Sequence, residues 1–237
     1  MIKIISFKIC PFVQRVTALL EAKKIPYQIE FIELSKKPQW FLDISPNGQV
    51  PVLVSEAGIP LFESNAIVEY IDEVSQPLES EVSPEQRAID RAWSYQASKH
   101  YLTQCSAQRS ADRDTLMQRS DKLNTVLDRV EKKLGDGPFF KGDSLSNVDL
   151  AWLPLLHRAD IINQFTCYDF IQAYPKVKEW QSALLDTGLA EKSVSSDFTQ
   201  RFTDFYLSQS SYLGSKKCDE KEGCNADNPV CHPKCCG

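Results

Sequence analysis

Hydrophobic positions along residues 1–75 switch repeatedly between the spacing of strands and the spacing of helices. Ile2 to Phe7 form an apolar run that is typical of a buried strand, and Tyr27, Ile29 and Phe31 alternate with polar residues as in a half-buried strand. The predicted elements of this part are strands at 2–7, 27–31, 50–54 and 59–62 and helices at 11–24, 38–45 and 64–74. Their order, βαβαββα, predicts a small α/β layer structure.

The pattern changes after residues 76–83, a polar, proline-containing segment without periodicity that predicts a linker. Beyond it only helical spacing recurs, and no convincing strand pattern appears. The predicted helices lie at 84–108, 116–134, 176–186 and 197–207, with one more starting after Ser146. We therefore predict an α/β domain at 1–75, a linker at 76–83, an all-helical domain at 84–213 and a cysteine-rich tail at 214–237.

Ser146-Asn147-Val148-Asp149 has the spacing of a capping box, with aspartate at the third helical position. Leu145 before it and Leu150 after it are placed for a hydrophobic staple. Both features define where a helix enters, so we assign this motif a structural role and no chemistry.

Composition limits the classes of function. The chain has 237 residues, of which 42% are apolar and 25% charged, as in a globular protein with a core. Its net charge is −5 and it has no dense basic stripe, which argues against nucleic-acid binding. No membrane-length apolar stretch and no secretory signal pattern appear. We therefore expect a cytoplasmic, membrane-free protein whose eight cysteines do not form a disulfide framework.

Cys10 is the foremost candidate for chemistry. It follows the first predicted strand and precedes Pro11, a residue suited to the first helical position because its missing N–H needs no partner. A thiol at a helix N-terminus meets unpaired N–H groups and the positive end of the helix dipole, which favour the nucleophilic thiolate. The alternative is a small buried cysteine that only caps the helix.

Three motifs together resemble the cytosolic glutathione S-transferase family: Cys-Pro-Phe-Val-Gln-Arg at 10–15, Asn-Gly-Gln-Val-Pro-Val-Leu at 47–53 and Phe-Glu-Ser-Asn-Ala-Ile at 62–67. The resemblance covers all but the tail and is greatest to the cysteine-type omega, lambda and dehydroascorbate-reductase classes. It implies a thioredoxin-like domain followed by a helical domain, glutathione as co-substrate, and a homodimer.

The resemblance also implies roles for individual residues. Cys10 becomes the catalytic residue, and Val50-Pro51 becomes a cis-proline turn whose backbone pairs with glutathione, as an open strand edge pairs with a peptide. Ser64 would cap the following helix and bind the γ-glutamyl carboxylate, while Glu63 would meet the ligand's ammonium group. The remaining implied glutathione residues are Phe12 and either Lys37 or Lys36, one of which would reach the glycine carboxylate.

We expect the acceptor substrate to bind between the domains, against the helix at 84–108. The candidate lining residues are Trp93, Tyr95, His100 and Tyr101, although aromatic residues at this spacing more often belong to a core.

Because Val13 stands where a C-x-x-C motif has its second cysteine, Cys10 has no neighbouring thiol to pair with. The predicted chemistry is therefore monothiol exchange, with thiol-transferase or dehydroascorbate-reductase activity and weak conjugation to aromatic electrophiles.

Two alternative functions use the same fold: a protein like the intracellular chloride channels, and a non-enzymatic binding protein.

The cysteine-rich tail is a separate candidate site, for metal binding or redox chemistry. It holds candidate thiolate and imidazole ligands for Zn or Cu(I), namely Cys218, Cys224, Cys231, His232, Cys235 and Cys236. Their spacing matches no zinc-finger pattern, so a redox-active tail that resolves Cys10 and an inert appendage stay open as alternatives.

Overall fold

The computed structural model describes residues 1–79, 81–166 and 168–215. Its N-terminal part follows the predicted order βαβαββα. The elements are β1 (Ile2–Ser6), α1 (Pro11–Ala22), β2 (Tyr27–Phe31), α2 (Gln39–Ile44), β3 (Val52–Val54), β4 (Pro60–Phe62) and α3 (Ser64–Val74). The sheet has the order β2-β1-β3-β4, with β1 and β2 parallel and the other pairs antiparallel. The predicted α/β layer structure is thereby confirmed.

Strand register gathers the predicted site residues at one end of this sheet. Near the end of β1, Ile5 lies opposite Val52, the first residue of β3. Val52 in turn lies opposite Phe62, the last residue of β4. The loop after β1, the turn before β3 and the start of α3 therefore meet at the same edge, although they are far apart along the chain.

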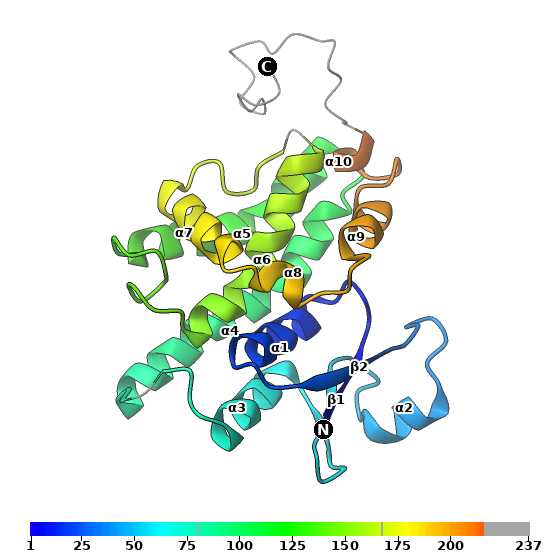
Figure 1. The fold of residues 1–237 in the computed structure, drawn as a ribbon. Coiled ribbons are helices and arrows are strands. Elements are labelled where there is room, and N and C mark those ends of the chain that lie inside the picture. Colours follow the sequence, from blue (N-terminus) through cyan, green and yellow to red (C-terminus); the bar gives the residue numbers. More distant parts are fainter. Residues whose placement is uncertain (80, 167, 216–237) are drawn as a thin grey trace.

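Alternating side chains bury both faces of the sheet. Ile4 and Leu53 belong to the main apolar core, which also includes residues of α1 and α3. Ile5 and Val52 point to the opposite face, where they cluster with Phe41 of α2. As a result α1 lies between the sheet and the helices that follow residue 83, whereas α2 lies on the other face of the sheet (Figure 1).

The second part is helical, and among its described residues no strand forms beyond β4. Its helices are α4 (Pro84–Gln108), α5 (Arg113–Lys133), α6 (Asn147–Phe165), α7 (Pro175–Asp186), α8 (Leu189–Lys192), α9 (Phe198–Tyr206) and α10 (Tyr212–Ser215). The helix expected at 116–134 starts earlier because Asp112 caps it, accepting a hydrogen bond from the Thr115 N–H at 2.8 Å. Within the described ranges, every helix is too short or too polar to span a lipid bilayer.

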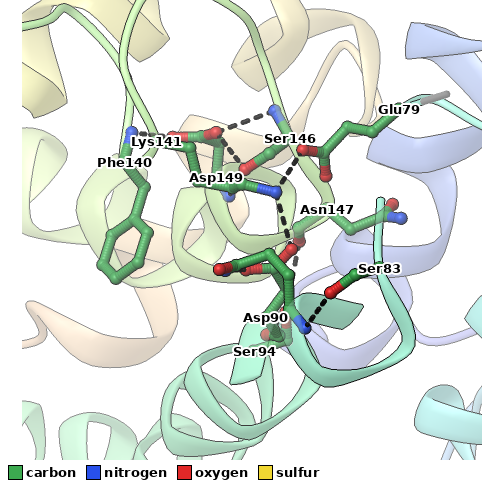
Figure 2. Close-up of polar contacts among 10 residues, drawn as sticks. Glu79, Ser83, Asp90, Ser94, Phe140, Lys141, Ser146, Asn147 and Asp149 are labelled. Carbon is green, nitrogen blue, oxygen red and sulfur yellow. Dashed lines mark hydrogen bonds and ion pairs between the residues drawn. The ribbon is translucent and has the colours of Figure 1, made fainter. Parts of the chain in front are cut away.

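The most buried helix, α6, packs between α4 and α1 and starts at the predicted capping box. Asp149 is fully buried there, and its carboxylate accepts hydrogen bonds from the backbone N–H groups of Ser146 and Phe140, both at 2.8 Å (Figure 2). It also accepts a hydrogen bond from Trp180 Nε1 at 2.6 Å. The motif therefore joins the loop before α6 and helix α7 to one carboxylate. Its predicted structural role is confirmed.

A second polar contact in Figure 2 ties the same loop to the start of the helical part. The Lys141 ammonium lies 2.6 Å from a Glu79 carboxylate oxygen and 2.7 Å from an Asp90 carboxylate oxygen on α4. One cation thus connects the segment before α4, α4 itself and the loop before α6.

Candidate active site

Cys10 is the N-cap residue of α1, with extended backbone angles, and Pro11 occupies the first turn. Its own N–H donates to the Phe7 carbonyl at 3.0 Å, and its carbonyl accepts from the Gln14 N–H at 3.2 Å. No side-chain hydrogen bond caps α1 at Cys10, but the N–H groups of Phe12 and Val13 lie near enough to the sulfur to lower its pKa, as expected at a helix start.

The sequence-based expectation that Cys10 is held as a thiolate is wrong for this structure. Although part of the residue is accessible to solvent, protein surrounds the sulfur, and this burial raises the pKa of Cys10 to about 11. The N–H groups of Val13 and Phe12 and the charge of Arg158 lower the pKa, as expected, but do not outweigh the loss of hydration. The thiol is therefore protonated at neutral pH.

The other predicted residues of the sheet edge lie where the register places them. The Val50-Pro51 peptide bond is cis, as predicted. Glu63 adopts φ 66° and its carboxylate accepts a hydrogen bond from Asn47 Nδ2 at 3.0 Å, which joins the loop before β3 to the start of α3. The expectation that Ser64 caps α3 is wrong, because Glu63 is the N-cap and Ser64 is the buried first residue of the helix.

The structure distinguishes between Lys37 and Lys36, the two candidates for contacting the glycine carboxylate of glutathione. The Lys37 ammonium lies 3.6 Å from the position that a Cβ on Gly48 would occupy, in the turn that leads to Val50. Gly48 itself has φ +57°, a conformation that favours glycine. Both lysine side chains are exposed, but among the described contacts only one of Lys37 reaches this turn. The geometry therefore favours Lys37 over Lys36 as the lysine that lies next to the turn before Val50.

The four candidate substrate-pocket residues divide into two that interact with the Cys10 motif, Tyr101 and Tyr95, and two whose described contacts lie within the helical part, Trp93 and His100. Tyr101 is fully buried and packs edge-on against Phe12, with ring centroids 5.0 Å apart, so it lies next to the Cys10 motif. Trp93 instead packs against Phe140 at 5.4 Å, inside the helical part. His100 donates from Nδ1 to the Gln96 carbonyl at 2.6 Å, one helical turn away, and Tyr95 is half-buried. Of the four, Tyr101 is joined to the Cys10 motif by a ring contact, and both Tyr101 and Tyr95 interact electrostatically with Arg15, the last residue of that motif.

A buried polar cluster beside Cys10 escaped the sequence analysis. Gln14 of α1 donates from Nε2 to His157 Nδ1 at 2.9 Å and accepts a hydrogen bond from Arg158 Nη1, and both of these partners belong to α6. Burial, together with the charge of Arg158, lowers the pKa of His157 to about 3, so its imidazole is neutral. The available signal was a His-Arg pair inside the otherwise apolar stretch from Leu150 to Ala159.

Arg15, the last residue of the motif at 10–15, is buried. Its guanidinium donates to the side-chain oxygen of Asn65 on α3. Arg15 therefore links α1 to α3 inside the protein.

The predicted tail ligands Cys218, Cys224, Cys231, His232, Cys235 and Cys236 lie outside the described residues. Within residues 1–79, 81–166 and 168–215, no group of three or more His, Cys, Asp or Glu side chains has an arrangement that could hold a metal ion. The expectation of Zn or Cu(I) in the tail stays a prediction.

Comparisons with known proteins agree with this architecture. Residues 9–74 match the family model of the glutathione S-transferase N-terminal domain, and residues 113–180 match that of the C-terminal domain. Pig glutathione S-transferase omega-1 is 30% identical over 220 residues, covering 89% of this chain and 88% of the relative. The probable cytosolic glutathione S-transferase DHAR1 of rice is 34% identical over 153 residues, covering 64% of this chain and 68% of the relative.

Among solved structures, glutathione transferase Omega 3C from Trametes versicolor superimposes with a TM-score of 0.70 at 27% identity, covering 82% of this chain and 89% of that one. The thioredoxin-like sheet, the helical second part and the matches over both halves lead to one conclusion. The chain belongs to the glutathione S-transferase family, with omega and dehydroascorbate-reductase members among its relatives.

Proposed function

We propose that this chain is a glutathione-dependent thiol transferase and dehydroascorbate reductase that uses Cys10 as its single nucleophile. The observation that carries the proposal is the thiol at the N-terminus of α1, facing the N–H groups of Phe12 and Val13, at the sheet edge that also holds the cis Val50-Pro51 bond. The omega and dehydroascorbate-reductase names of the relatives support the same class of reaction.

Glutathione would dock along this edge through its backbone and its charged ends. The Val50 backbone would pair with the peptide, as a strand edge pairs with an extended ligand. Glu63 would meet the ammonium group and Ser64 the γ-glutamyl carboxylate, at the start of α3. Lys37, at the Gly48 turn, would meet the glycine carboxylate. Phe12, packed on Tyr101, would form the wall next to the thiol.

The exchange takes two displacements. The Cys10 thiol loses its proton, and its sulfur attacks the glutathione sulfur of a mixed disulfide, so that the substrate leaves as a thiolate and Cys10 becomes joined to glutathione. A second glutathione thiolate then attacks the glutathione sulfur of that bond, which yields glutathione disulfide and returns the electron pair to Cys10. With dehydroascorbate, the same two glutathione molecules supply the two electrons that reduce it to ascorbate.

The raised pKa of Cys10 sets the pH dependence of the first step. With a pKa of about 11, roughly one thiol in 10⁴ is ionised at pH 7 in the ligand-free protein. Each unit of pH increases the thiolate fraction about tenfold until the pH approaches that pKa. The chemical step therefore gains rate as pH rises through the neutral range.

The full-length chain should be assayed with dehydroascorbate, with a small mixed disulfide of glutathione, and with an aromatic chloro-electrophile. We expect turnover of the first two, weak conjugation of the third, and retention on immobilised glutathione. Retention without any turnover would favour a non-enzymatic binding protein, and the absence of both would contradict the proposal. A variant that ends at Gly214, assayed in parallel, measures what the tail contributes.

The lysine pair provides a matched test of the binding site. Replacing Lys37 by alanine removes a charge-assisted hydrogen bond of about 1.5 kcal/mol, so we expect KM for glutathione to rise about tenfold while kcat changes little. Lys36→Ala removes the same charge one residue away and is expected to leave KM nearly unchanged. Steady-state kinetics of both variants decides the assignment, and a larger effect at Lys36 would reverse it.

We also propose that the chain works in the cytoplasm, as the name of one relative says of that protein, and that it forms a homodimer. A reducing compartment keeps Cys10 available as a thiol. Light scattering of the purified full-length chain tests the dimer, and a monomeric mass at assay concentrations would contradict it.

A further inference from the structure

Arg158 is a fully buried cation near Cys10. Its Nη1 donates to the Pro154 carbonyl at 2.9 Å and to Gln14 Oε1, and its Nη2 donates to the Ile9 carbonyl at 3.2 Å. Its Nε has no hydrogen-bond partner, and no carboxylate in the described part of the chain lies within ion-pair distance of the guanidinium. A buried guanidinium without a counter-ion is costly, so its position calls for an explanation.

The ionisable groups that face Arg158 belong to four helices. They are Cys10 at the start of α1, Tyr101 and Cys105 on α4, His157 on α6 and Tyr206 on α9. The Phe198 ring of α9 also lies against the guanidinium, 5.2 Å from ring centroid to Cζ. His157 is neutral, and the phenols of Tyr101 and Tyr206 have pKa values raised by burial. A thiolate is therefore the anion that Arg158 is placed to meet.

Cys105 interacts with the charge of Arg158 more strongly than Cys10 does, but Cys10 is the thiol that becomes an anion in the proposed reaction. Arg158 donates to the carbonyl of Ile9, the residue before Cys10, so it is tied to the loop that carries the nucleophile. Cys105 hydrogen-bonds with the phenol of Tyr206, a neighbour that is neutral at physiological pH. In the second displacement of the proposed reaction, the S–S bond breaks and its electron pair passes to Cys10 Sγ, so negative charge develops beside this cation.

We infer, on the basis of the proposed function, that Arg158 is a positioning residue for thiol exchange: it is the fixed positive charge beside which the Cys10 sulfur becomes an anion. Gln14 holds the guanidinium in place. Its Oε1 accepts from Arg158, while its Nε2 donates to His157 Nδ1 at 2.9 Å and to the Ala190 carbonyl at 3.3 Å. Helices α1, α6 and α8 thus orient the charge before any substrate arrives, the arrangement that stabilises developing charge most effectively.

The test is alkylation of Cys10 by iodoacetamide in the full-length protein, followed from pH 6.5 to 9 by peptide mass spectrometry, which separates Cys10 from the other cysteines. An opposite charge nearby typically lowers a thiol pKa by one unit or more, and the alkylation rate at fixed pH follows the thiolate fraction. We therefore expect Arg158→Gln and Arg158→Met to slow Cys10 alkylation at least about tenfold at pH 8. Arg158→Lys, which keeps the charge, is expected to recover most of the rate.

Equal alkylation rates in the folded wild type and the folded neutral variants would overturn the inference. A rate in Arg158→Lys as slow as in Arg158→Met would also overturn it, since charge would then not be the cause. Alkylation needs no glutathione, so a wild type without transferase activity refutes the proposed function but leaves this comparison intact.

A second measurement leaves Arg158 unchanged, in case the neutral variants do not fold. Cys10→Asp places a permanent carboxylate beside the guanidinium, and Cys10→Asn is its neutral counterpart of the same shape. We expect the aspartate variant to melt at a higher temperature than the asparagine variant at pH 7, and to lose this advantage as acid protonates the carboxylate. An aspartate variant no more stable than the asparagine variant would show that Arg158 does not serve position 10.

Discussion

Replacing Cys10 by serine is expected to reduce thiol-transferase and dehydroascorbate-reductase activity at least roughly a thousandfold, the scale seen when an enzyme loses its nucleophile. A serine hydroxyl at the start of α1 keeps the size of the side chain and the N–H groups of Phe12 and Val13 that face it. It forms no bond with glutathione that a second glutathione can exchange. The loss should therefore fall on kcat, whereas KM for glutathione should change little.

The same substitution is expected to increase conjugation to aromatic electrophiles. A neutral hydroxyl donates a hydrogen bond to a bound glutathione thiolate, which makes glutathione itself the nucleophile. The two activities, measured on one preparation, should change in opposite directions. Cys105→Ser, which removes the other free thiol among the described residues, is the matched control and is expected to keep most of the thiol-transferase activity. Unchanged thiol transfer in Cys10→Ser would rule out the single-nucleophile mechanism.

Asp149→Ala is expected to lower the free energy of unfolding by about 3 kcal/mol, the largest stability effect that we predict. The substitution leaves the N–H groups of Ser146 and Phe140 and Trp180 Nε1 without their acceptor, in a fully buried place. Each orphaned donor costs about 1–3 kcal/mol. Removing the carboxylate also relieves its own desolvation, the main cause of its raised pKa, so the net loss stays below the sum over the donors.

Urea unfolding of the full-length chain measures this loss. Ser83→Ala is the matched control, because Ser83 also caps a helix, accepting from the Gln86 N–H at 3.1 Å, but is exposed. Loss of an exposed cap costs about 1 kcal/mol. An Asp149→Ala loss no greater than that of Ser83→Ala would mean that the buried donors find other partners. Because Asp149 lies away from Cys10, activity per folded molecule should be retained.

Local patterns predicted the fold well because the interactions behind them are local. The alternation of Tyr27, Ile29 and Phe31 depends only on the two faces of a strand, and the structure has β2 at the same residues. Pro11 after Cys10 and Asp149 after Ser146 concern N–H groups within one helical turn, and both helices start where those pairs predicted. The cap of α3 is the exception, since Glu63 occupies the position that was assigned to Ser64.

The protonation state of Cys10 depends on distant residues. The helix N-terminus alone favours a thiolate, and the N–H groups of Val13 and Phe12 do lower the pKa of Cys10. Desolvation outweighs them, and the groups that share this pocket, such as Cys105 and Arg158, come from helices far along the chain. No pattern within a short window contains that information.

The amino-acid sequence by itself determined the order of strands and helices, the position of a cysteine at a helix start and the family motifs, because each is written within a few consecutive residues. Only the tertiary structure decided that Lys37 rather than Lys36 approaches the Gly48 turn, that Tyr101 of the proposed pocket residues packs on Phe12, and that Arg158 lies buried near the thiol. The physical reason is that burial and Coulomb interactions depend on distance in space, which strand register and helix packing set, and not on distance along the chain.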